Sequence, residues 1–149
     1  MPGEQSALFE QSDWTGTSSR LNNRAVQVLI VDDSADAAAS LTMLLELEDI
    51  TAQTAGDAEA ALRFVEHTTP VLLLIDIGLP GMNGYQLAQR LRGMEQLRGA
   101  TLIALTGREG ASAQEQALFD QFWTKPVDPK RLIEEVKSVI SRAADRPRD

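Results

Sequence analysis

Five polar side chains of this chain stand directly after short apolar segments, and their types and order suit phosphate chemistry. They are Asp32 and Asp33 after residues 26–31, Asp76 after 71–75, Thr106 after 101–105 and Lys125 after 122–124. Carboxylate oxygens favour Mg²⁺, a hard ion that keeps several waters and then binds phosphate oxygens. A carboxylate beside such an ion can act as a nucleophile and form an aspartyl phosphate.

The charges of these side chains indicate how such a site would be balanced. Three carboxylates brought together repel one another, which costs free energy unless they are protonated or neutralised. A divalent cation supplies two positive charges and Lys125 supplies a third. In that arrangement Asp76 is the nucleophile, and the Lys125 ammonium and the Thr106 hydroxyl contact the transferring oxygens.

Alternating apolar and helical segments predict how the chain brings these side chains together. The predicted strands are 26–31, 50–54, 71–75, 101–105 and 122–124. The predicted helices are 35–48, one capped by Asp57, 84–94, 112–120 and one capped by Asp128 with Pro129 at its first position. Five strand–helix units predict an α/β fold with a doubly wound parallel sheet. Ligands of such sheets bind outside the carboxyl ends of the strands, where the polar side chains would gather.

Helical periodicity predicts the faces that cover this sheet. The expected inward positions are Ala37, Leu41, Leu44 and Leu45 in the first helix, Ala58, Ala61, Leu62 and Val65 in the second, Gly84, Leu87, Ala88 and Leu91 in the third, and Leu132, Ile133, Val136, Val139 and Ile140 in the last. Trp123 is expected to be exposed and to serve in docking.

Length and composition bound the classes of function. The 149 residues suit one domain, expected at 25–143, with a mobile tail at 1–24 and a short tail at 144–149. The absence of cysteine fits a reducing compartment, so a cytoplasmic location is expected. Neither a signal peptide nor a long apolar span is found, which predicts no membrane insertion. A net charge of -8 disfavours nucleic-acid binding, because that needs clustered Lys and Arg.

Over about residues 25 to 143 the chain resembles the receiver domains of two-component response regulators. The resemblance is carried by the acidic pair in "LIVDDS", the aspartate in "LLLIDIGLPGMNGYQLA", the Thr-Gly of "IALTG" and the Lys-Pro of "FWTKPVDP". It implies a flavodoxin-like (βα)5 fold with strand order 2-1-3-4-5. It also implies a signalling phosphoprotein that promotes its own phosphorylation and dephosphorylation and is not an enzyme in the ordinary sense. No output domain is expected after residue 143, so it would be a stand-alone receiver.

The resemblance also implies a role for each site residue. Asp76 would be the phosphoacceptor and a ligand of Mg²⁺ or Mn²⁺. Asp33 would bind the metal directly, Asp32 through water, and Gly78 through its backbone carbonyl. Lys125, placed by a cis bond to the following proline, would pair with the acceptor and then with the phosphoryl group.

Switching is implied by the same resemblance. Thr106 would move toward the phosphoryl group and draw Phe122 inward, which changes a protein-binding surface. Gly78 and Arg108 stand where side chains shield or admit the water that hydrolyses the phosphoryl group. Leu118 replaces a glycine that receivers usually carry before the fifth strand, so the fourth helix is expected to end differently.

The implied partners are a histidine kinase or a histidine phosphotransfer protein. A homodimer through the fourth helix, fifth strand and fifth helix is a further implied assembly. Two alternatives on the same fold stay open, a phosphorylation-independent protein-binding module and a phosphorelay sink. A metal-dependent phosphatase with an aspartyl nucleophile is disfavoured, because its chemistry wants an acid two residues after the nucleophile and Gly78 stands there.

Overall fold

The computed structural model describes residues 26–107 and 117–145 of the chain. Its strands are β2 Val28–Val31, β3 Ala52–Ala55, β4 Leu72–Asp76, β5 Thr101–Thr106 and β6 Gln121–Thr124. Its helices are α2 Ala35–Leu47, α3 Ala58–Val65, α4 Gly84–Arg92, the short 3₁₀ helix η2 Glu95–Leu97 and α6 Pro129–Asp145. Within these ranges none of the helices is long and apolar enough to cross a membrane.

The five strands form one parallel sheet in the order β3-β2-β4-β5-β6. Counted along the chain this is the order 2-1-3-4-5, so the predicted fold class is confirmed. Val31 pairs with Ile75 on the neighbouring strand, and Thr106 pairs with Thr124. Because all strands run the same way, their carboxyl ends, and the polar residues at those ends, meet at one edge of the sheet.

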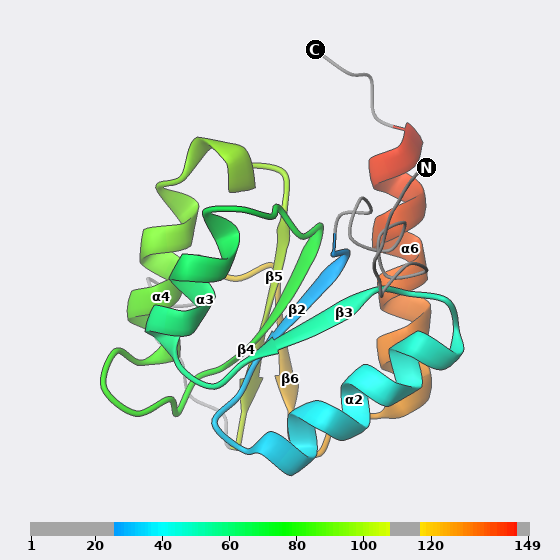
Figure 1. Cartoon of the computed structure of the whole chain (residues 1–149), viewed down its shortest axis with the longest axis horizontal. Helices are drawn as coiled ribbons and strands as arrows, with labels where there is room; N and C mark the ends of the chain where they lie inside the picture. The colour runs from blue at the N-terminus through cyan, green and yellow to red at the C-terminus, as the bar shows by residue number, and fades with distance from the viewer. Residues whose placement is uncertain (1–25, 108–116, 146–149) are drawn as a thin grey trace, which may run out of the picture.

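Helices cover both faces of the sheet, with α3 and α4 on one face and α2 and α6 on the other (Figure 1). The side chains of alternate residues in each strand therefore pack in two different hydrophobic cores, one on each face of the sheet. Leu29 and Val31 pack with α3 and α4, whereas Val28 and Ile30 pack with α2 and α6. Burial on both faces explains why these strands read as continuous apolar segments.

Helix starts follow the predicted caps. The Asp57 carboxylate accepts a hydrogen bond from Ala60 N at 2.8 Å, and α6 begins at Pro129 after Asp128, whose carboxylate accepts from Lys130 N at 3.1 Å. Such caps satisfy backbone N–H groups that have no partner within the helix. The local sequence thus determines where α3 and α6 begin.

The expected inner face of α2 is wrong at one position. Ala37 is exposed and Ala38, at 2% exposure, is buried with Leu41 and Leu45. The segment "ADAAAS" offers little contrast between apolar and polar positions, so its periodicity does not define a face.

The expected exposure of Trp123 is also wrong. Its side chain is 2% exposed and packs in the core shared with α2 and α6. The indole N–H donates to Gln121 Oε1 at 2.9 Å, and the Arg131 guanidinium carbon lies 4.6 Å from the ring centroid. Trp123 is therefore held between the sheet and α6, with its polar N–H satisfied.

Some expectations fall outside the described residues. They concern the tail at 1–24, Arg108, and residues 112–116 of the predicted fourth helix. Residues 117 and 118 form a turn that leads into β6, and Leu118 does not have the positive φ that the replaced glycine would favour. Among the described non-glycine residues only Asp49 has a positive φ, of 63°.

Candidate functional site

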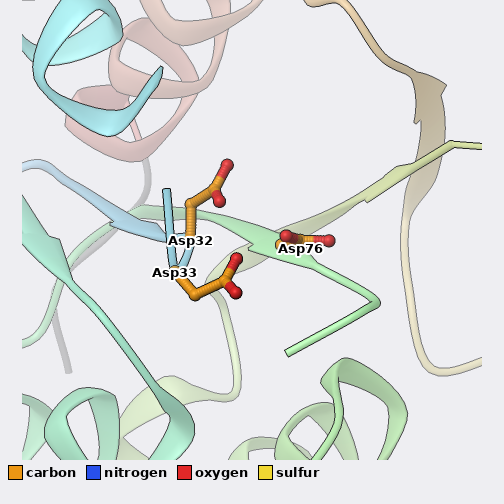
Figure 2. A group of neighbouring side chains, drawn as sticks. All are labelled: Asp32, Asp33 and Asp76. Atoms are coloured by element: carbon orange, nitrogen blue, oxygen red, sulfur yellow. The ribbon is translucent and has the colours of Figure 1, made fainter. Parts of the chain in front are cut away.

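Asp32, Asp33 and Asp76 meet at the carboxyl edge of the sheet, as the sequence predicts. Figure 2 shows the first two side by side after β2 and Asp76 at the end of the adjacent β4. One carboxylate oxygen from each lies within 4.8 Å of the others. Asp32 and Asp76 are 3% and 7% exposed, whereas Asp33 is exposed. Three acids from two separate sequence segments therefore share one small volume, partly buried and partly open to solvent.

Lys125 brings a positive charge to this cluster from beyond the end of β6. Its Nζ lies 3.0 Å from Asp76 Oδ2 and 3.6 Å from Asp32 Oδ2. Its backbone N–H donates to Thr106 O at 2.9 Å, and the Lys125–Pro126 peptide bond is cis. The contact joins residues 49 positions apart in the sequence.

Backbone N–H groups hold two of the carboxylates in place. Ser34 N donates to Asp32 Oδ1 and Gly78 N donates to Asp76 Oδ1, both at 2.9 Å. The Ser34 hydroxyl in turn accepts from Ala37 N at 3.3 Å and caps α2. Ser34 is not among the site residues predicted from the sequence, although a serine just before an alanine-rich helical segment is a recognisable capping signal.

Lys125 alone does not neutralise the three carboxylates of the site. Burial raises the pKa of Asp32 above its ordinary 3.8, and the Asp76 carboxylate adds to this, while Ser34 N–H and the Lys125 ammonium act in the other direction. Burial lowers the pKa of Lys125, but its hydrogen bond to Asp76 and the charge of Asp32 outweigh this, so the pKa lies above 10.5. Lys125 is therefore protonated at neutral pH, and the three carboxylates together still carry more negative charge than it balances.

The donor set fits a hard divalent cation. Each of the three aspartates contributes an oxygen, and their mutual distances of up to 4.8 Å allow one ion to contact several of them. With three carboxylates ionised, Lys125 leaves two negative charges, which one Mg²⁺ would balance. All-oxygen ligation also fits Mn²⁺. That the backbone carbonyl of Gly78 also binds the metal stays a prediction.

Thr106 and Phe122 lie on β5 and β6, the two strands that follow Asp76 in the sheet. Thr106 is the last residue of β5 and one position beyond Leu105, the partner of Asp76. Phe122 is partly buried, and its ring centroid lies 5.3 Å from that of Phe119 in an edge-to-face arrangement. Phe122 therefore packs on the α3–α4 face of the sheet, and Thr106 lies at the carboxyl end of the strand next to Asp76.

A cleft of ≈ 480 Å³ opens beside the acid cluster. Its walls include Asp32 and Lys125 from the site and apolar residues from α2 and from the segment after β6, among them Leu41 and Val127. The cleft is therefore polar where Asp32 and Lys125 line it and apolar elsewhere, and Asp76 is not among its lining residues.

Comparison with known proteins shows what this chain resembles. A family model described as the response regulator receiver domain matches residues 28–137. An uncharacterized 14.6 kDa protein of Leptolyngbya boryana is 35% identical over 111 residues, which cover 72% of this chain and 85% of that protein. The DNA-binding response regulator MtrA of Mycobacterium leprae is 33% identical over 121 residues, 81% of this chain and 54% of MtrA. The chain therefore spans about half the length of MtrA.

A solved structure gives the same answer for the fold. The receiver domain protein of Methanospirillum hungatei, described as CheY-like, has a TM-score of 0.71 and 28% identity to this chain. The match covers 83% of this chain and 100% of that one. Strand order, sequence motifs and three-dimensional similarity thus agree.

Proposed function

The chain belongs to the response regulator receiver domain family, and we propose that Asp76 is its phosphoacceptor, which takes a phosphoryl group from a histidine kinase or a histidine phosphotransfer protein. Receivers are signalling domains of two-component systems and not enzymes in the ordinary sense. The observation that carries the proposal is the approach of Lys125 Nζ to within 3.0 Å of Asp76 Oδ2, inside a cluster of three aspartates.

The proposed metal ligands are Asp33 and Asp76 directly, Asp32 through water, and the Gly78 carbonyl. When bound, Mg²⁺ would neutralise the carboxylates and bind phosphoryl oxygens. Supporting this set are the shared oxygen donors and the negative charge that Lys125 leaves unbalanced.

In the proposed transfer, an Asp76 oxygen forms a bond to phosphorus while the bond from phosphorus to the donor nitrogen breaks. The electron pair of the broken bond stays on the imidazole of the donor. Gly78 N–H fixes one acceptor oxygen, and Lys125 contacts the other and then the transferring oxygens. Most of the catalysis is therefore positioning and charge stabilisation, as phosphoryl transfer requires.

We further propose that the phosphoryl group acts through Thr106 and Phe122. Phosphorylation adds about −1.5 to −2 charges and three acceptor oxygens, one of which the Thr106 hydroxyl can satisfy. Movement of Thr106 would change the packing of Phe122 against Phe119 and so alter a protein-binding surface. Gly78 and Arg108 are proposed to set the lifetime of the phosphoryl group.

The remaining proposals concern location and partners. A cytoplasmic location fits the receiver family. So does a homodimer through the predicted fourth helix (112–120), β6 and α6. MtrA is described as a DNA-binding response regulator, but the match to this chain covers only 54% of MtrA. The net charge of -8 of this chain favours protein partners over nucleic acid.

Two alternatives on the same fold make different predictions. A phosphorylation-independent module would not accept phosphoryl groups, and a phosphorelay sink would accept them without changing partner affinity. Incubation with Mg²⁺ and acetyl phosphate, followed by borohydride reduction and peptide mass spectrometry, locates an acyl phosphate directly. We expect the reduced residue to be Asp76. Modification at another aspartate, or on His67, would contradict the assignment.

A further inference from the structure

The first turn of α4 lies directly against the backbone of the acceptor. Gly84 is buried, and a Cβ built on it would lie 2.7 Å from Asp76 O, 2.8 Å from Ile77 Cα and 3.2 Å from Asp76 C. All three are backbone atoms, which have no rotamer by which to move away. Only glycine allows the helix to approach this closely.

The Asp76–Ile77 peptide is bonded to the sheet through Ile77 N, and the next peptide is bonded to the start of α4 through Ile77 O. Ile77 N donates to Leu105 O of β5 at 3.0 Å, and Gly84 N donates to Ile77 O at 3.0 Å. A side chain at position 84 would therefore push on a peptide whose far side is already bonded to the sheet. The shift would pass to the Asp76 carboxylate and to its bond with Gly78 N.

The local sequence fixes α4 in this position. Asn83 Oδ1 accepts from Gln86 N, and Gln86 Oε1 accepts from Asn83 N, both at 2.9 Å. This capping box defines the first turn, and Leu87 and Leu91 anchor the helix in the core. The first turn of α4 is thus held by its own cap and by the core beneath it.

We propose that Gly84 is a positioning residue for the phosphoacceptor, which acts by letting the start of α4 pack closely against the Asp76–Ile77 peptide, whose N–H is bonded to β5. The inference rests on the proposed function of Asp76. Displacement of a reacting group by about 1 Å can cost about 10²-fold in rate. Gly84→Ala should therefore slow phosphoryl acceptance and weaken Mg²⁺ binding, because both depend on where this segment lies.

The test compares Gly84→Ala with Gly56→Ala. Gly56 also follows a strand at the carboxyl edge, has no positive φ, and a Cβ there meets nothing within 4 Å. Rates with acetyl phosphate at saturating Mg²⁺, and Mg²⁺ dissociation constants by calorimetry, are measured well below each unfolding midpoint. A purely structural role would lower the midpoint and leave the rate per folded molecule unchanged.

We expect Gly84→Ala to accept phosphoryl groups at least tenfold more slowly and to bind Mg²⁺ at least fivefold more weakly, with Gly56→Ala within twofold of the wild type. Wild-type rate and affinity in Gly84→Ala would overturn the inference. If the wild type binds Mg²⁺ and accepts no phosphoryl group, the proposed function fails, and the Mg²⁺ affinities alone decide the role of Gly84.

Asn83→Ala is the second variant, in case Gly84→Ala does not fold. It removes the side-chain acceptor of the capping box and adds no Cβ at position 84. We expect acceptance to slow by two- to fivefold as the helix start loosens. An unchanged rate would show that the start of α4 does not hold the acceptor.

Discussion

Lys125 Nζ lies 3.0 Å from Asp76 Oδ2, although β5 lies between β4, which ends at Asp76, and β6, which ends just before Lys125. The long lysine side chain spans this strand and also reaches within 3.6 Å of Asp32 Oδ2. The ammonium and a metal ion would therefore share the same carboxylates. Because the ammonium and the metal compete for these carboxylates, loss of Lys125 should slow phosphoryl transfer without weakening metal binding.

Lys125→Met is expected to slow phosphoryl acceptance by about 10²-fold, the usual scale for removal of one preorganised charge donor. Mg²⁺ affinity should stay the same or rise, because a competing cation is removed. Calorimetry and single-turnover phosphorylation measure the two effects separately. Lys130→Met, at an exposed lysine of α6, is the control. Weaker Mg²⁺ binding in Lys125→Met would contradict this division of roles.

Asp32→Asn is expected to stabilise the metal-free protein at neutral pH by on the order of 1 kcal/mol. Because burial raises the pKa of Asp32 above 3.8, its ionised form opposes folding. Asparagine keeps the acceptor for Ser34 N and removes the charge. The advantage should shrink as the pH falls through the raised pKa toward 3.8, since Asp32 then becomes neutral in both states. Thermal unfolding across this pH range, with and without Mg²⁺, checks the sign; a destabilised variant at pH 7 without metal would refute it.

Asp49→Gly is expected to raise the free energy of unfolding by about 0.5–1 kcal/mol. Asp49 has a φ of 63° just after α2, where Asp49 N donates to Glu46 O and Ile50 N donates to Leu45 O. These bonds form a helix-ending motif that glycine fits without steric cost. Urea unfolding provides the measurement. Asp49→Ala is the matched variant and should destabilise the protein, so equal effects of the two would exclude backbone strain as the cause.

Arg92→Met is expected to cost about 1–3 kcal/mol of stability. Its guanidinium donates to Leu118 O at 3.0 Å, Ala100 O at 3.3 Å and Asp120 Oδ2 at 2.9 Å, so one side chain joins the end of α4 to the approaches of β5 and β6. Arg90→Met, at an exposed arginine of the same helix, should have little effect. Similar urea midpoints for the two variants would show that these bonds contribute little.

The sequence predicts most of the fold because local signals agree with the tertiary arrangement. Apolar segments covered on both faces mark the strands, and Asp57 and Asp128 mark two helix starts. The grouping of Asp33, Asp76 and Lys125 follows from parallel strands whose ends meet at one edge.

Other features leave no local signal. Trp123 stands in a four-residue strand, and only the packing of α6 shows that its face is covered. The contact of Gly84 with Asp76 is made by backbone atoms and has no hydrophobic pattern. Arg92 finds its partners up to 28 positions away, beyond the reach of any helical or strand period.

The most direct test of the account is intact-mass analysis after incubation with Mg²⁺ and acetyl phosphate. Asp76→Asn and a sample with a metal chelator are run beside the wild type. We expect one phosphoryl group to appear on the wild type and to be absent from both controls. A phosphoryl group on Asp76→Asn, or equal labelling with and without the chelator, would contradict Asp76 as a metal-dependent phosphoacceptor.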